Sequence, residues 1–274
     1  MLNRDLARDE MFLRRFVNEA RAVARLNHPN IIQIFDVSEY EGRHFFSMEY
    51  VRGESVGDML DRSGRIPIVQ SIQIMIAITN ALIEAGNHGI VHRDIKPDNM
   101  MVGLNGTIKL ADLGIARSSR AGQDLRITDK ESVMGTPYYI SPEQAEDPSG
   151  VDQRADIYSL GASLYHMLTG RVPFYGTNLA SVLMKLAREE PPDAIRVNPR
   201  IPYHLNRVLR RMMAKSPDQR HRSPRELLEE LETIESELAE PGRRNEPALR
   251  KESERVVRID ATETDTTGLV FAED

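Results

Sequence analysis

The stretch that decides the fold reads HRDIKPDN at residues 92–99, and DLG follows it at residues 112–114. Both stretches carry polar groups that suit the transfer of a phosphoryl group from a metal-bound nucleotide. The carboxylate of Asp94 can accept the proton of an attacking hydroxyl, and the ammonium group of Lys96 can offset the charge of the transferred group. The sequence therefore predicts a phosphoryl-transfer site built around one loop.

The same stretches offer ligands for the metal ion. Mg²⁺ prefers hard oxygen ligands, and amide and carboxylate oxygens are of this kind. Asn99 supplies an amide oxygen, and Asp112 supplies a carboxylate. We therefore expect these two residues to bind the metal of the nucleotide.

These stretches resemble the signature of protein kinases, whose catalytic loop reads H-R-D-x-x-x-x-N and whose metal-binding motif is D-F-G. Later landmarks follow in the family's order: SPE at residues 141–143 stands where A-P-E is expected, and DIYSLG at residues 156–161 resembles the D-x-[WY]-S-x-G helix. A lone HRD could belong to a loop of solvated charges, but the ordered set favours the kinase fold. We predict an α+β fold with two lobes, an incomplete N-terminal β lobe and a mainly α-helical C-terminal lobe.

The resemblance gives supporting roles to residues around the catalytic aspartate. A histidine such as His92 invites a general-base interpretation, but in the family it is structural. Arg93 implies control by phosphorylation, because a phosphate on the activation segment would pair with it. Asp156 would hold the backbone of the catalytic loop. Glu143 and Arg220 would form a buried ion pair beneath the activation segment.

By resemblance, residues 48–53 form the hinge between the lobes and bind ATP. Backbone groups of Glu49 and Val51 would bond the adenine edge, and Met48 would be the gatekeeper, although in bare sequence Met48 is more often a core residue. Glu19 stands where the family's helix C glutamate pairs with a strand lysine; without the resemblance it is one exposed carboxylate among many. The expected cofactors are ATP and Mg²⁺, with Mn²⁺ as a possible substitute.

Residues 112–143 correspond to the activation segment of Ser/Thr kinases of the bacterial, eukaryotic-like type. The hydroxyl of Thr136 would contact the catalytic aspartate and lysine. Thr128 and Ser132 are the candidates for regulatory phosphorylation, with a slight preference for Thr128. The expected reaction transfers the γ-phosphoryl group of ATP to Ser/Thr hydroxyls of proteins, and self-phosphorylation or a homodimer is an open option.

The sequence departs from the family at its start. No G-x-G-x-x-G occurs in the chain, and its first lysine is Lys96, so the strand lysine that should hold the phosphates is absent. One interpretation is a genuine kinase whose start was assigned to an internal methionine, which the intact catalytic loop favours. The alternative is a catalytically impaired, truncated kinase that acts as a binding or regulatory module. We expect weak Mg-ATP binding and little transfer by residues 1–274 alone, and an in-frame glycine-rich loop in the upstream DNA would favour the first interpretation.

Composition restricts the other function classes. The net charge of −6 argues against a nucleic-acid surface, which needs a basic excess. The absence of cysteine excludes disulfides and fits a reducing compartment. No uninterrupted apolar run approaches the roughly 18 residues of a membrane span. We therefore expect a cytoplasmic protein with no membrane segment in this chain.

The resemblance implies a partial N-lobe at residues 1–51 and a C-lobe at 52–240, and the sparse apolar residues at 241–274 predict a disordered tail. In the N-lobe we expect a helix at 10–26 and strands at 31–37 and 44–50. In the C-lobe, Asn105-Gly106 predicts a hairpin between residues 100–104 and 107–110. The other expected elements of the C-lobe are helices at 55–60, 67–88, 153–169, 178–189, 203–214 and 224–238.

Overall fold

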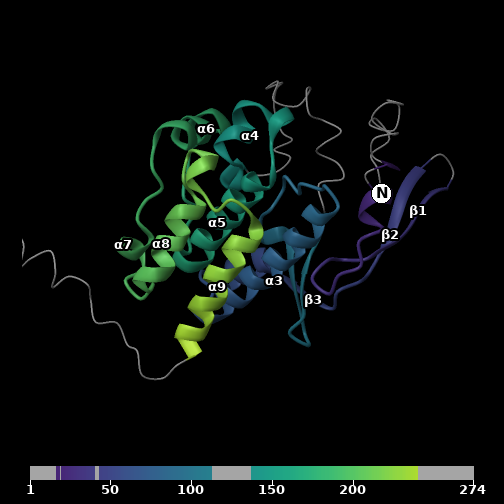
Figure 1. Ribbon diagram of the computed structural model, residues 1–274, viewed down its shortest axis with the longest axis horizontal. Helices are drawn as coiled ribbons and strands as arrows, with labels where there is room; N and C mark the ends of the chain where they lie inside the picture. The colour runs from purple at the N-terminus through teal and green to yellow at the C-terminus, as the bar shows by residue number, and fades with distance from the viewer. Residues whose placement is uncertain (1–16, 19, 41–42, 113–136, 240–274) are drawn as a thin grey trace, which may run out of the picture. The chain divides into compact units, whose positions relative to one another are not determined.

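The computed structural model describes residues 17–18, 20–40, 43–112 and 137–239, and all of them belong to one folded unit (Figure 1). Four predicted site residues, Glu19, Thr128, Ser132 and Thr136, lie outside the described residues. The tail expected at 241–274 lies outside them as well.

Two strands follow a short helical stretch at the start of the described chain. Residues 17–18 and 20–23 are helical, and the helix has ended before residue 27, as its Asn-His-Pro-Asn sequence predicts. Strand β1 (Ile34–Tyr40) pairs antiparallel with β2 (Arg43–Met48). The first strand begins later than predicted because Ile31 instead forms a parallel bridge with Leu110, in the second sheet.

The second sheet has the order β3-β4-β5, with antiparallel pairing throughout. Its strands are β3 (Gly53–Ser55), β4 (Met100–Gly103) and β5 (Ile108–Leu110). The predicted hairpin joins β4 to β5, and Gly106 adopts the left-handed φ of 80° that favours glycine in such a turn. Strand β3 was not predicted, because three residues are too few to establish an alternating pattern.

A long buried helix, α3 (Ile68–Asn87), packs against α5 (Gln153–Thr169) and α9 (Pro224–Ala239). Its sequence is apolar on nearly every side, which predicts burial rather than a surface position. Of the described helices, α3 alone has the length and hydropathy that a membrane span requires, and 56% of that stretch is buried within the protein. Packing against α5 and α9 accounts for its apolar character.

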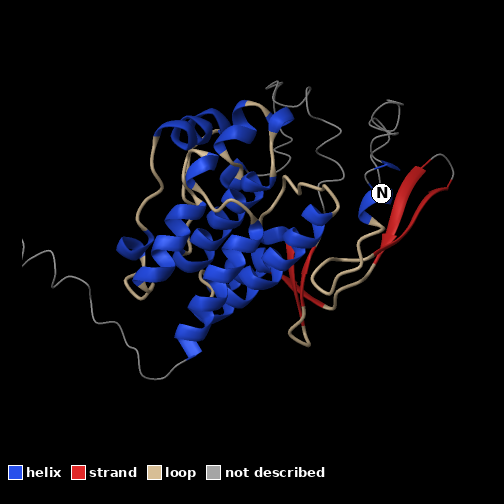
Figure 2. Ribbon diagram, viewed as in Figure 1, coloured by secondary structure: helices blue, strands red, loops and turns tan. Residues whose placement is uncertain are grey.

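Helices make up most of the described residues after β5, as Figure 2 shows. As predicted, Asp152 caps α5 and Gly170 ends it with a φ of 72°. Helix α5 packs closely against Met212 at Gly161. A Cβ at Gly161 would lie 2.8 Å from the Cβ of Met212, so this position requires glycine. The remaining described helices are α2 (Val56–Ser63), α4 (Pro142–Glu146), α6 (Leu179–Arg188), α7 (Ala194–Val197) and α8 (Tyr203–Met212).

Candidate functional site

The catalytic loop between α3 and β4 brings its three predicted catalytic residues together. The Nζ atom of Lys96 lies 3.0 Å from Oδ2 of Asp94. The Nδ2 atom of Asn99 donates to the backbone oxygen of Asp94 at 2.8 Å and to its Oδ2 at 3.2 Å. An ammonium group and an amide thus converge on one carboxylate. This arrangement orients the carboxylate of Asp94.

Asp112 shares this site with Asp94. Asp112 is an exposed residue, yet the pKa of its carboxyl is raised above the usual value, first by desolvation and then by the negative charge of Asp94, while Lys96 acts in the opposite direction. The two carboxylates therefore lie within electrostatic reach of each other. Asp112 has a left-handed φ of 51°, and the preceding N–H, of Ala111, donates to the backbone oxygen of Asn99 at 2.8 Å. That bond joins Asn99 to the residue before Asp112, so it holds the two predicted metal ligands near one another.

A buried carboxylate anchors the loop from α5. Asp156 is 1% exposed and accepts hydrogen bonds from the backbone N–H groups of His92 at 2.8 Å and Arg93 at 2.7 Å. Arg93 has a left-handed φ of 65°, which a residue other than glycine adopts at a cost. Burial raises the pKa of Asp156 to about 7, whereas the two backbone N–H bonds oppose that rise.

The surroundings of His92 favour the structural interpretation over the general-base one. Its side chain is fully buried, and burial lowers its pKa to about 4. Its Nε2 lies 3.1 Å from the carbonyl oxygen of Ala111, so we assign the proton to Nε2. Its Nδ1 then accepts from the backbone N–H of Asp94 at 3.2 Å. Both ring nitrogens of a neutral imidazole are thus engaged by backbone groups.

Gln144 is a positioning residue that sequence reasoning missed. It is buried, and its Nε2 donates to the backbone oxygen of Arg93 at 3.0 Å. Its Oε1 accepts from the hydroxyl of Ser141 at 3.1 Å, within the capping box of α4. The S-x-x-Q pattern at residues 141–144 predicts that box. No local pattern indicates the bond to Arg93, because 51 residues separate the two.

The predicted ion pair of Arg220 and Glu143 is present and the arginine is buried. Its NH1 and NH2 atoms lie 2.5 and 2.8 Å from the two carboxylate oxygens. The other guanidinium bonds go to backbone oxygens of Ala214, Arg154 and Lys215 at 2.7 to 2.9 Å. The guanidinium group of Arg220 therefore connects α4, α5 and the segment after α8.

The predicted hinge begins at Met48, which is the last residue of β2 and is 47% exposed. The backbone N–H of Glu49 donates to the oxygen of Gln33 at 2.8 Å, so only its carbonyl oxygen is left for a nucleotide. The side chain of Glu49 pairs with Lys109 at 2.9 Å. Val51, the other predicted adenine contact, is partly buried two residues before β3.

Comparison with known proteins gives matches over most of the chain. The family described as protein kinase domain matches residues 2–230. The chain is 37% identical over 237 residues to a probable serine/threonine-protein kinase, CPE1738, of Clostridium perfringens, which covers 86% of this chain and 34% of that protein. It is 36% identical over 233 residues to serine/threonine-protein kinase PrkC of Bacillus subtilis, and this match covers 85% of this chain and 35% of that protein.

A third relative, serine/threonine-protein kinase PknB of Mycolicibacterium smegmatis, is 36% identical over 272 residues, which cover 98% of this chain and 43% of that protein. The chain thus spans between 34% and 43% of the length of these three relatives. Among solved structures, Rad53 1–466 in complex with AMP-PNP aligns with a TM-score of 0.66 at 23% identity, over 78% of this chain and 53% of that one. That likeness concerns the fold alone.

Proposed function

The chain belongs to the protein kinase domain family, and from this premise we propose that it is a serine/threonine protein kinase. It would transfer the γ-phosphoryl group of ATP to Ser or Thr hydroxyls of protein substrates. The single observation that carries the proposal is the convergence of Lys96 and Asn99 on the carboxylate of Asp94. The names of its bacterial relatives support the choice of acceptor residue.

In this proposal Asp94 is the catalytic base. A substrate hydroxyl oxygen forms a bond to the γ-phosphorus, and the bond from that phosphorus to the bridging oxygen breaks, which releases ADP. The hydroxyl proton passes to the carboxylate of Asp94. Lys96 offsets negative charge on the transferred group, and Asn99 keeps the carboxylate oriented.

The donor set fits a divalent cation, for which we propose Mg²⁺ with Mn²⁺ as a substitute. Asp94 engages the amide nitrogen of Asn99, which leaves the amide oxygen as the ligating atom. The raised pKa of Asp112 means that its negative charge is poorly compensated in the protein alone, and a bound cation would relieve this. The cation would neutralise phosphate charge on the nucleotide.

We also propose how the chain binds adenine, how it is regulated and where it is located. The carbonyl oxygen of Glu49 and the backbone of Val51 would meet the adenine. Thr128 and Ser132 remain candidates for self-phosphorylation, and a homodimer remains one way to achieve it. A cytoplasmic location is also part of the proposal and fits a chain without cysteine.

The test measures phosphate transfer from radiolabelled ATP to a Ser/Thr-rich acceptor protein, with phosphoamino-acid analysis of the product. The original chain is compared with Asp94→Asn and with Asp98→Asn, an exposed aspartate of the same loop. Even if transfer is slow, we expect labelled Ser or Thr that Asp94→Asn reduces at least 100-fold and Asp98→Asn retains. ATP binding with no Asp94-dependent transfer would contradict the proposal and favour the binding-module alternative.

A further inference from the structure

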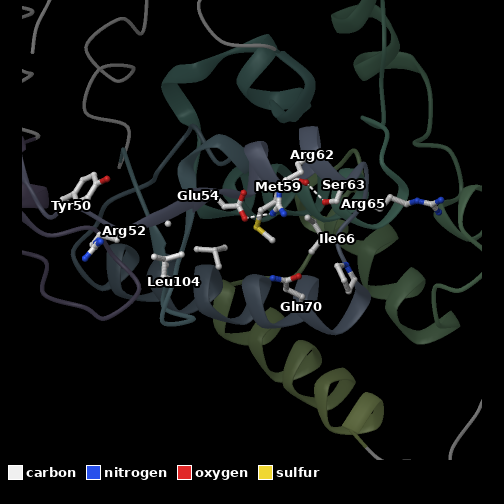
Figure 3. Close-up of a pocket in the computed structure, with 14 residues that line it drawn as sticks. Tyr50, Arg52, Glu54, Met59, Arg62, Ser63, Arg65, Ile66, Gln70 and Leu104 are labelled. Atoms are coloured by element: carbon white, nitrogen blue, oxygen red, sulfur yellow. Dashed lines mark hydrogen bonds and ion pairs between the residues drawn. The ribbon is translucent and has the colours of Figure 1, made fainter.

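A pocket of about 710 Å³ opens beside the hinge, between β3, β4 and the α2–α3 connection. This volume is typical of ligand sites in proteins. Its floor is apolar and includes Met59, Ile66 and Val102. In Figure 3, Tyr50 and Arg52 lie at one end near Leu104, Gln70 lies below, and Arg65 turns outward at the other end.

The pocket includes Tyr50, Arg52 and Gly53 of the predicted hinge, but not the residues predicted to contact the adenine. None of its lining residues belongs to the catalytic loop, and neither Met48 nor Val51 lines it. On the β3–β4 ladder, the pairs Gly53–Gly103 and Glu54–Val102 line the pocket, whereas the next pair, Ser55 and Met101, does not.

Two large apolar side chains at the pocket project into solvent. Tyr50 is 85% exposed and Leu104 is 84% exposed. Two such residues beside one pocket, with polar residues around them, indicate an interaction site more strongly than a single exposed apolar residue does. The pocket thus offers a place for an apolar side chain of a partner.

The charges at the pocket favour an acidic partner. Three arginines and one glutamate line it, an excess of two positive charges on a chain whose net charge is −6. Glu54 is paired with Arg62 at 2.6 Å in the middle of the pocket (Figure 3). Within the described residues, the guanidinium of Arg52 has no hydrogen-bond or ion-pair partner. It is therefore available to a carboxylate beside the apolar anchor.

We propose that this pocket docks a segment of the protein substrate in which an aliphatic side chain is flanked by acidic residues. The aliphatic side chain packs on Leu104 and Val102, and a flanking carboxylate pairs with Arg52. The inference rests on the proposed kinase function, because it takes the docked partner to be the substrate. Docking outside the catalytic cleft would raise the local concentration of the acceptor hydroxyl at Asp94.

The test titrates the full chain against a fluorescent peptide pool with a fixed Glu-Asp-Leu-Glu core and mixed flanking residues. It uses no ATP, so failed docking is distinguishable from failed phosphoryl transfer. We expect saturable binding, with at least tenfold weaker affinity for Arg52→Glu/Leu104→Asp. Both substituted residues are exposed, and circular dichroism checks that the double variant folds.

The matched control is Arg207→Glu/Tyr203→Asp, which makes the same charge change at exposed residues of α8 that do not line the pocket. It should bind like the original chain. Pools with Lys-Arg-Leu-Lys or Glu-Asp-Ser-Glu cores should bind at least tenfold more weakly than the acidic leucine pool. The proposal is overturned by absence of binding up to about 1 mM, by equal loss in both double variants, or by a single-stranded RNA probe that binds where the peptide pool does not.

Discussion

The carboxylate of Asp156 accepts a hydrogen bond from the backbone N–H of Arg93 at 2.7 Å, across 63 positions of sequence. On its other side, the carbonyl oxygen of Arg93 accepts a hydrogen bond from Nε2 of Gln144 at 3.0 Å. The peptide groups on both sides of this left-handed residue are therefore fixed by buried side chains from two different helices. Because Asp94 follows directly, its backbone position depends on both contacts.

Gln144→Glu is predicted to loosen this support while it preserves the size of the side chain. The glutamate can still accept from Ser141, but it cannot donate to the backbone oxygen of Arg93, so a buried acceptor loses its partner. We expect the free energy of unfolding to fall by about 1–3 kcal/mol, measured by urea denaturation. Gln219→Glu, the same change at an exposed residue, is the control. Equal and small losses in both variants would show that the bond to Arg93 contributes nothing.

Arg220→Lys is predicted to be severely destabilising although it keeps the charge. Lysine cannot reproduce a planar fork that bonds Glu143 twice and three backbone oxygens besides. We expect a loss of about 3–5 kcal/mol, because a partly buried carboxylate and several carbonyl groups lose a buried guanidinium donor. Thermal and urea denaturation provide the measurement, and Arg207→Lys at an exposed position controls for the change of residue type. A loss in Arg220→Lys no greater than in this control would contradict the prediction.

The burial of His92 predicts a loss of stability in mild acid. Its pKa is about 4 in the folded protein and 6.5 in the unfolded chain, so the unfolded state binds the proton more readily between these values. The stability that the neutral imidazole of His92 contributes is fully present above pH 6.5 and is lost as the pH falls toward 4. It amounts to about 3 kcal/mol, since one pKa unit corresponds to about 1.4 kcal/mol.

The measurement compares the chain with His92→Gln by urea denaturation from pH 7 to pH 4. Relative to His92→Gln, the original chain should lose about 3 kcal/mol of unfolding free energy as the pH falls from 7 to 4. His204→Gln, at an exposed histidine, is the control for removing an imidazole. A difference that does not change with pH would mean that folding leaves the pKa of His92 at its unfolded value, which would contradict the prediction.

Much of the fold was predictable because its long elements carry strong local signals. The all-round apolar pattern of α3 and the cap and stop of α5 at Asp152 and Gly170 are examples. The elements that escaped prediction are short. Strand β3 has three residues and α7 has four, so neither completes a recognisable period. The displaced start of β1 depends on a bridge from Ile31 to Leu110, a contact 79 positions distant in the sequence.

The candidate site shows the same division. The residues of the catalytic loop are close in sequence, so their convergence on Asp94 could be expected from their spacing. The roles of Asp156, Glu143 and Arg220 came from resemblance to the family, because their contacts cross the chain. The bond of Gln144 to Arg93 and the pocket beside the hinge had no signal of either kind. Both depend on which surfaces the folded helices and strands bring together.

If Asp94 and Asp112 share one site, the pKa of the Asp112 carboxyl must depend on the charge of Asp94. Carbon-detected NMR can follow that carboxyl through a pH titration in the original chain, in Asp94→Asn and in the control Asp98→Asn. Because the negative charge of Asp94 disfavours ionisation of Asp112, Asp94→Asn should lower the pKa of Asp112, and Asp98→Asn should leave it close to its original value. The same pKa for Asp112 in all three proteins would contradict the claim that these carboxylates belong to one site.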